Sequence, residues 1–240
     1  MKRFFTTFFT LGLIASLLTG CIINVNPDDN YNPQDERTAT FNLTDFDRLN
    51  MGSAFAITVT QGASFAITAR GYRNDVDDLN VFVRNGVLNA EYRVNRNRRY
   101  KMQFTITMPT LRGVDFSGAS QSNVSGFRNL AELSIALSGA SKGTFDVQAT
   151  RTVVNLSGAS EGRLNGSGTT LQADLAGAST LRSFDYPTTD AILDVSGASQ
   201  ANIAVSRNLN VTASGASTVR YRGNPTIEQR LSGASTVRPE

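Results

Sequence analysis

Two serines of this chain lie in a sequence context that is typical of a catalytic nucleophile. Residues 139–143 read Gly-Ala-Ser-Lys-Gly and residues 158–162 read Gly-Ala-Ser-Glu-Gly, and both match the Gly-x-Ser-x-Gly elbow of α/β-hydrolases. That motif requires a strand-turn-helix context and a histidine that accepts the serine proton, yet the chain contains no histidine. We therefore interpret both matches as by-products of a repeat rich in glycine and serine.

Carboxylates are a second route to catalysis, because some β-helical polysaccharide lyases and hydrolases act with acidic and basic side chains alone. Asp115, Asp174 and Asp194 occupy equivalent positions of the repeat. Carboxylates stacked about 5 Å apart can share a proton or hold calcium. Because Ala136 and Asn155 interrupt this aspartate column and no long loop supplies the walls of a cleft, the pattern favours an exposed polar column. A carbohydrate-active enzyme stays open as the alternative function.

Arginine forms a column of its own. The positions that lie three residues after each repeat motif hold Asn123, Thr144, Arg163, Arg182, Asn202, Arg220 and Arg238. We call the four arginines the arginine ladder. Guanidinium groups at regular spacing suit phosphates and sulfated or acidic sugars, which makes the ladder a candidate ligand-binding face. The same side chains could instead pair with a neighbouring acidic column and cover the sheet with their apolar stems.

The densest basic stretch covers residues 93–101 and includes Arg96, Arg98 and Arg99. A loop of this composition could touch anionic lipid or lipopolysaccharide. A solvated charged loop is the alternative interpretation. We therefore treat these three arginines as a second group of candidate ligand-binding residues.

The element that positions these columns is a tetrapeptide repeat. Ser-Gly-Ala-Ser begins at Ser117, Ser138, Ser157, Ser196, Ser214 and Ser232, and Ala-Gly-Ala-Ser begins at Ala176. Successive starts differ by 21, 19, 19, 20, 18 and 18 residues, which suits one coil of a β-solenoid. Apolar and mostly polar residues alternate before each motif, as in a strand with one buried face. Glycine and small residues fit a tight corner inside a stack of strands.

The N-terminal half lacks the motif but has strand patterns. Residues 54–59 and 64–69 are separated by Thr-Gln-Gly-Ala, and residues 79–84 and 87–92 flank Asn-Gly; both arrangements predict hairpins. A further strand is expected over residues 102–108. We therefore predict a hairpin-rich β region over residues 41–108 and a β-solenoid over residues 109–240.

The first residues resemble a bacterial lipoprotein signal. Lys2 and Arg3 precede an apolar run that ends near Leu18, and Leu-Thr-Gly-Cys follows at residues 18–21. This resemblance implies cleavage after residue 20 and acylation of Cys21, with an ordinary signal peptide as the alternative. Residues 21–40 carry prolines, asparagines and aspartates, and we predict that they form a flexible tether. The protein is then expected in the bacterial cell envelope, with the outer membrane favoured over the inner.

Composition restricts the remaining functions. The chain has 23 Lys and Arg against 20 Asp and Glu, and removal of the signal peptide takes away Lys2 and Arg3, which leaves 21 against 20. No overall basic field is present for nucleic acid. Histidine and tryptophan are absent, and Cys21 is the sole cysteine, so we predict no disulfide, no metal site and no cofactor.

The order of these elements resembles the putative auto-transporter adhesin head GIN domain family, which is also described as a domain of unknown function. The similarity covers Phe41 to Arg238 and rests on the early paired strands, the strand from Met102 to Pro109 and the recurring small-residue turns. The resemblance implies a right-handed parallel β-helix of two sheets, shaped like pectin lyases without their catalytic residues. It also implies a role in cell adhesion.

These observations predict a non-enzymatic, membrane-anchored lipoprotein whose β-helical surface binds a glycan, a partner protein or the cell envelope. Two alternatives stay open. One is the carbohydrate-active enzyme that would use the aspartate column. The other is a self-assembling structural module, because the last repeat at residues 236–240 has no helical cap.

Overall fold

The structure is a computed structural model that describes residues 35–98 and 100–240, all within one compact unit of residues 32–240. The predicted signal peptide, Cys21, most of the predicted tether and Arg99 lie outside the described residues. The N-terminal elements are β1 (Glu36–Phe41), β2 (Arg48–Met51), β3 (Ala56–Gln61), β4 (Ala66–Tyr72), α1 (Arg73–Asp77), β5 (Leu79–Arg84), β6 (Val87–Tyr92) and β7 (Gln103–Met108). The later strands are β8 (Gly113–Phe116), β9 (Gln121–Ser125), β10 (Leu130–Leu137), β11 (Lys142–Leu156), β12 (Glu161–Leu175), β13 (Thr180–Val195), β14 (Gln200–Ala213), β15 (Thr218–Arg222), β16 (Thr226–Leu231) and β17 (Thr236–Pro239).

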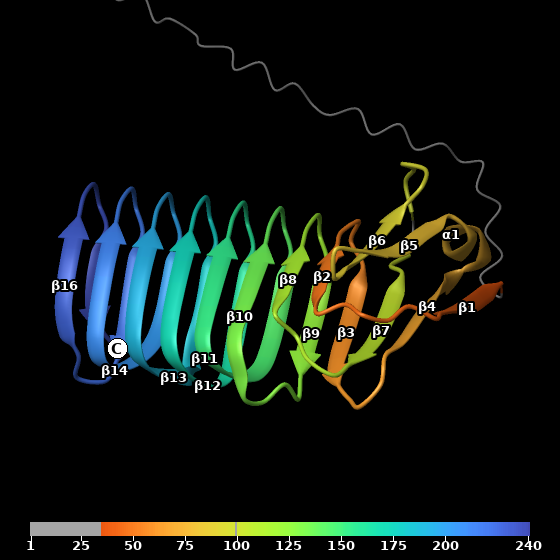
Figure 1. Ribbon diagram of the computed structural model, residues 1–240. Coiled ribbons are helices and arrows are strands. Elements are labelled where there is room, and N and C mark those ends of the chain that lie inside the picture. Colours follow the sequence, from red (N-terminus) through yellow and green to blue (C-terminus); the bar gives the residue numbers. More distant parts are fainter. Residues whose placement is uncertain (1–34, 99) are drawn as a thin grey trace, which may run out of the picture. The chain divides into compact units, whose positions relative to one another are not determined.

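Strands β8 to β17 form a parallel β-solenoid, which confirms the predicted fold class (Figure 1). We call the sheet whose strands lead into the Ser-Gly-Ala-Ser corners face A; it contains β8, β10, the second halves of β11 to β14, and β16. Face B is the sheet whose strands follow the corners; it contains β9, the first halves of β11 to β14, β15 and β17. The pairing follows the sequence repeat, since Val154 lies beside Ala173 on face A and Thr144 lies beside Arg163 on face B.

The repeat motif forms the corner of each rung, as predicted. Gly158 has a φ of 73°, and a Cβ atom placed there would lie 2.5 Å from the carbonyl oxygen of Gly139 in the rung below. This close approach lets the Ala159 amide donate a 2.7 Å hydrogen bond to that oxygen. Ser160 is buried, and its hydroxyl donates to the carbonyl oxygen of Ser157 over 2.7 Å. The serine of the apparent nucleophile elbow therefore closes a turn.

The core lies between the two faces and consists of apolar columns at rung spacing. One column on face A holds Phe116, Leu137, Leu156, Leu175, Val195 and Ala213, all buried. On face B, Phe145 fills the interior, and Gly143 leaves room for its ring: an added Cβ would lie 2.6 Å from the Cε2 atom of Phe145. Alternate residues face water, so each outward column repeats along the stack.

The N-terminal region continues the solenoid by two rungs that carry no Ser-Gly-Ala-Ser motif. β2 pairs in parallel with β8, and β3 with β9, so β2 and β3 form the rung below. β6 and β7 pair in parallel with the other sides of β2 and β3 and form the next rung. The described residues of the basic stretch, 93–98 and 100–101, therefore occupy the position of an enlarged corner. Strands β5, β4 and β1 then close this end of the stack with antiparallel pairs.

Of the two hairpins predicted for this region, one is confirmed and the other is wrong. The hairpin around Asn85 and Gly86 is confirmed, with φ angles of 51° and 73° that suit a tight turn between β5 and β6. The predicted hairpin of residues 54–69 is wrong. β7 lies between β3 and β4, parallel to the first and antiparallel to the second, because its alternating apolar residues fit between both strands.

The predicted tether is also shorter than expected at its C-terminal end. Residues 36–41 form β1, which pairs antiparallel with β4 from Glu36 opposite Tyr72 to Phe41 opposite Ile67. Ala39 and Phe41 are half-buried against the core. Their alternation with threonines is a strand pattern, and burial of Phe41 favours order at this position.

Candidate ligand-binding surface

The arginine ladder lies in register on face B, on the side of the strands that faces water. Arg163 is beside Arg182, Asn202 occupies the next rung, and Arg220 is beside Arg238. The alternation places the ladder outside because its neighbours Gly162, Leu164 and Leu181 are buried. The structure therefore brings together four of the candidate residues that the repeat predicted, with one interruption at Asn202.

A shallow pocket of about 310 Å³ lies over this ladder between Arg163 and Arg222. Asn202 forms part of its lining and is only 8% exposed. Arg222 stacks over the ring of Phe184, with 4.1 Å between the Cζ atom and the ring centroid. Such cation–π contact fixes the position of a guanidinium without neutralising its charge. The pocket thus has a cationic wall supported by an aromatic ring.

Carboxylates neutralise part of this face. Glu161 accepts a 2.7 Å hydrogen bond from the Nε atom of Arg182 and lies 3.7 Å from the Nζ atom of Lys142. The hydrogen bond from Arg182 lowers the pKa of the Glu161 carboxyl below its usual value. Glu240 lies 3.7 Å from Arg220 and 3.8 Å from Arg222.

On face B, two ladder arginines have no ion-pair partner among the described residues, and one buried donor of a third has no hydrogen-bond partner. Arg163 and Arg238 make no ion pair there, and the Nε atom of Arg220 is buried without a hydrogen-bond partner. Six cations border the ladder, namely Lys142, Arg163, Arg182, Arg220, Arg222 and Arg238, against the carboxylates Glu161, Asp185 and Glu240. A further carboxylate of face B, Asp146, pairs with Arg128. The alternative interpretation, in which every ladder arginine pairs with an acidic side chain, therefore holds for Arg182 and Arg220 only.

The aspartate column lies on the other sheet. Asp174 and Asp194 are beside one another on face A, whereas Ala136 and Asn155 separate them from Asp115. All three aspartates are exposed. Among the described residues, no group of three or more histidine, cysteine, aspartate or glutamate side chains is arranged to hold a metal ion. The column does not converge with Arg182, which projects from the opposite face.

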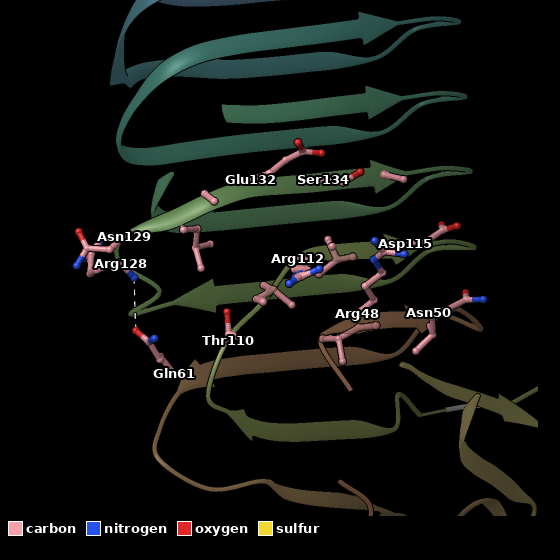
Figure 2. A pocket seen from close by; sticks show the side chains of 18 residues that line it. Arg48, Asn50, Gln61, Thr110, Arg112, Asp115, Arg128, Asn129, Glu132 and Ser134 are labelled. Carbon is pink, nitrogen blue, oxygen red and sulfur yellow. Dashed lines mark hydrogen bonds between the residues drawn. The ribbon is translucent and has the colours of Figure 1, made fainter. Parts of the chain in front are cut away.

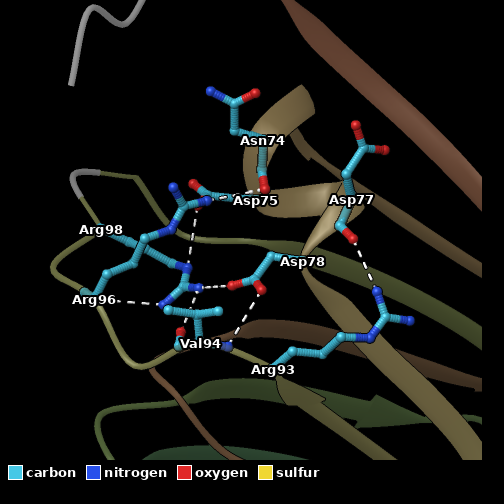
Figure 3. Close-up of polar contacts among 8 residues, drawn as sticks. All are labelled: Asn74, Asp75, Asp77, Asp78, Arg93, Val94, Arg96 and Arg98. Atoms are coloured by element: carbon cyan, nitrogen blue, oxygen red, sulfur yellow. Dashed lines mark hydrogen bonds and ion pairs between the residues drawn. The ribbon is translucent and has the colours of Figure 1, made fainter.

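The second candidate group, in the enlarged corner of residues 93–98, is held by ion pairs to α1 and its C-terminal flank (Figure 3). Asp75 is 3% exposed at its side chain and pairs with Arg96 at 2.9 Å and with Arg98 at 3.1 Å. Arg98 also pairs with Asp78, and its guanidinium lies 3.4 Å from the centroid of the Tyr92 ring. Burial is the main cause that raises the pKa of Tyr92. These two arginines therefore stabilise the corner, and Arg99 lies outside the described residues.

A larger hollow than the pocket over the ladder lies over face A near β8 (Figure 2). It measures about 1060 Å³ and has a floor that includes Gly113, Ser134 and Ala136. It exists because β8 pairs only with residues 134–137 of β10, which leaves residues 130–133 without a strand on that side. Arg48 and Asp115 border it. Basic and acidic side chains therefore both line this broad, open groove.

Residues 45–225 match the family described as putative auto-transporter adhesin, head GIN domain. The chain belongs to this family. The GIN domain spans both extra rungs and the ladder as far as Arg220, and it ends before Arg238. No curated protein matches the chain.

Solved structures share the fold of this GIN domain. A putative adhesin from Bacteroides fragilis is 21% identical, with a TM-score of 0.77 over 86% of this chain and 98% of that one. A putative adhesin from Parabacteroides merdae is 16% identical, with a TM-score of 0.71 over 86% and 97%. A putative lipid binding protein from Parabacteroides distasonis is 14% identical, with a TM-score of 0.67 over 86% and 97%. At these identities the similarity concerns the fold alone.

Sequence reasoning missed several residues of the arginine face. Arg222 and Phe184 join the pocket from outside the ladder column. They lie two residues after Arg220 and Arg182, in a column whose members differ in residue type, so no repeated residue marked them. Sequence reasoning also missed the groove on face A, which depends on the short length of β8. Within the described part of the GIN domain, no helix has the length and apolar character needed to cross a bilayer.

Proposed function

We propose that this GIN domain is a non-enzymatic adhesive module, anchored by a lipid on Cys21 and displayed in the bacterial cell envelope, where face B binds a glycan or a cell-surface protein. One observation carries the proposal. The two columns that the repeat predicted lie on opposite faces of the solenoid, the aspartate column on face A and the arginine ladder on face B. Acid–base catalysis requires the acid, the base and the substrate-binding groups to converge on one substrate, so the carbohydrate-active alternative that joins the aspartate column to Arg182 loses its support.

The anchoring part of the proposal rests on the N-terminal sequence. Leu-Thr-Gly-Cys at residues 18–21 resembles a lipobox, and residues 22–34 would connect the acylated cysteine to β1. We favour the outer membrane. The partners we propose are the membrane, through the lipid, and a glycan or a surface protein, through the solenoid. No nucleic acid is included, because the charge of the mature chain is nearly balanced.

Attachment of whole cells tests this function. Bacteria that make the protein, bacteria that lack it, and bacteria with the gene restored are counted on surfaces coated with acidic polysaccharide, neutral polysaccharide or host-cell protein. We expect deletion to reduce attachment to at least one coating and restoration to recover it. Equal attachment by all three strains on every coating would contradict an adhesive role.

A further inference from the structure

We propose that the arginine ladder binds an acidic polysaccharide that runs along the solenoid axis and places successive anionic groups against Arg163, Arg182 and Arg220. This inference rests on the proposed adhesive function and names its ligand class. The glycan lies across the strands of face B and over the pocket between Arg163 and Arg222. Sulfate or carboxylate groups would accept hydrogen bonds from the guanidiniums.

The first support is the set of unused donors. Arg163 has no ion pair among the described residues, although it lies beside Arg182, which is paired with Glu161. The Nε atom of Arg220 is buried and lacks a hydrogen-bond partner. That atom is closed off from solvent, so an anionic group in the pocket would meet the outer nitrogens of Arg220, whose side chain is 37% exposed, and the guanidinium of Arg163. Charge-assisted hydrogen bonds to these nitrogens are stronger than bonds between neutral groups.

The second support is the spacing of the ladder. Neighbouring strands lie about 4.8 Å apart, so the four steps from Arg163 to Arg238 cover roughly 19 Å. A single small anion can reach only neighbouring guanidiniums over such a distance. An extended polymer with regularly placed charges can meet all of them, and each added contact occurs at high effective concentration. The geometry therefore fits a chain better than an isolated ion.

The third support is the chemistry between the arginines. Gln200 and Asn202 contribute amide groups to the pocket lining, and amides can donate to and accept from sugar hydroxyls. Phe184, the aromatic residue of the pocket lining, lies under Arg222, so the face lacks the row of free aromatic rings on which single-stranded nucleic acid stacks. These groups favour an acidic glycan.

The test measures how the full-length protein, kept in a neutral detergent, binds fluorescent heparin oligosaccharides and oligogalacturonides of graded length by anisotropy. The affinity should rise with oligosaccharide length over the span of the ladder and should fall as salt is added. Changing Arg163, Arg182 and Arg220 together to glutamine should weaken binding about a hundred-fold at low salt. This total corresponds to a loss of about ten-fold or less in affinity for each of the three charged contacts removed. A triple lysine variant should recover part of the affinity, because it keeps the charges without the bidentate geometry.

The matched control removes three arginines elsewhere. Arg151, Arg207 and Arg230 have side chains that are 47%, 66% and 72% exposed, and their change to glutamine alters the net charge of the chain equally. This control should lose only the small part of the affinity that the net charge supplies. Equal losses in both triple variants, or no dependence on oligosaccharide length, would overturn the proposal. A cooperative thermal unfolding transition in each variant would show that the fold is intact.

Two further outcomes separate this inference from the adhesive function. The protein could instead bind phosphatidylglycerol vesicles through the ladder and fail to bind the oligosaccharides. This result would contradict a glycan ligand and would indicate that face B binds anionic lipid. If cells that carry the glutamine triple variant still attach as well as wild-type cells, adhesion stands and the ladder is not its binding site.

Discussion

Each corner glycine carries a positive φ and lies against the glycine of the next rung. A side chain at Gly158 would be strained at a φ of 73° and would meet the carbonyl oxygen of Gly139 at 2.5 Å. We predict that Gly158→Ala lowers the free energy of unfolding by about 2–4 kcal/mol, measured by urea denaturation. The neighbouring Ala159 is exposed, so Ala159→Ser should change it by less than about 0.5 kcal/mol. Similar effects of the two substitutions would contradict this account of the corner.

Glu161 competes with any anionic ligand for Arg182. We predict that Glu161→Gln increases the affinity of the full-length protein for heparin oligosaccharides by roughly three- to ten-fold, since it frees a guanidinium and removes a repelling charge. Anisotropy titration measures this change. An affinity that is unaltered or reduced would indicate that the ligand does not approach Arg182.

The same carboxyl gives a pH dependence with a defined sign. Its pKa is lowered in the folded protein, chiefly by the hydrogen bond from Arg182. The ion pair therefore adds stability above the unfolded-state pKa of about 4.5, and this contribution is lost as the pH falls through the folded-state pKa. Thermal unfolding of wild type and Glu161→Gln should accordingly differ more near neutral pH than in acid. A difference that grows in acid would contradict the assignment.

At the scale of elements, α1 and the enlarged corner after β6 hold each other through Asp75. This carboxylate is buried and serves two arginines, so its loss leaves two guanidiniums partly desolvated. We predict that Asp75→Ala costs about 3 kcal/mol, whereas Asp77→Ala, at an ion pair whose side chains are 51% and 52% exposed, costs less than about 1 kcal/mol. Hydrogen exchange of the backbone amides of residues 73–98 measures the loss of stability in both variants. Equal protection in the two variants would contradict a structural role for the network.

The sequence predicted the solenoid rungs because their corners share a motif and their strands share a two-residue alternation. It did not predict the rungs formed by β2 with β3 and by β6 with β7, because their corners at residues 52–55 and 93–102 have different residues and lengths. The wrong hairpin over residues 54–69 has a related cause. Proximity in sequence favoured pairing of β3 with β4, yet β7, which follows much later, competes for both edges.

The candidate site was predictable to a similar extent. Its ladder follows from the period of the repeat, and the register of Arg163 with Arg182 confirms the spacing. The pairing of Arg98 with Asp75 was not predictable, since it depends on the position of α1, which no motif indicated. The unsatisfied Nε atom of Arg220 likewise depends on packing rather than on spacing.

At the scale of the whole molecule, the lipid that we propose on Cys21 should decide where the solenoid resides. We predict that Cys21→Ala moves the protein from the membrane fraction to the soluble fraction of the envelope, because a solenoid surface without acyl chains lacks a strong membrane anchor. Cell fractionation followed by immunoblotting measures the distribution. Retention of the variant in the membrane fraction would contradict lipid anchoring as the means of attachment.

If this GIN domain binds without catalysis, it should hold an acidic polysaccharide without cleaving it. Acidic polysaccharide is incubated with the full-length protein, and the bound and free polymer are recovered and sized by chromatography. We expect the protein to retain the polymer, salt to release it, and the polymer to keep its original length. Recovery of shortened chains that depend on Asp174 or Asp194 would contradict it and would restore the enzymatic alternative.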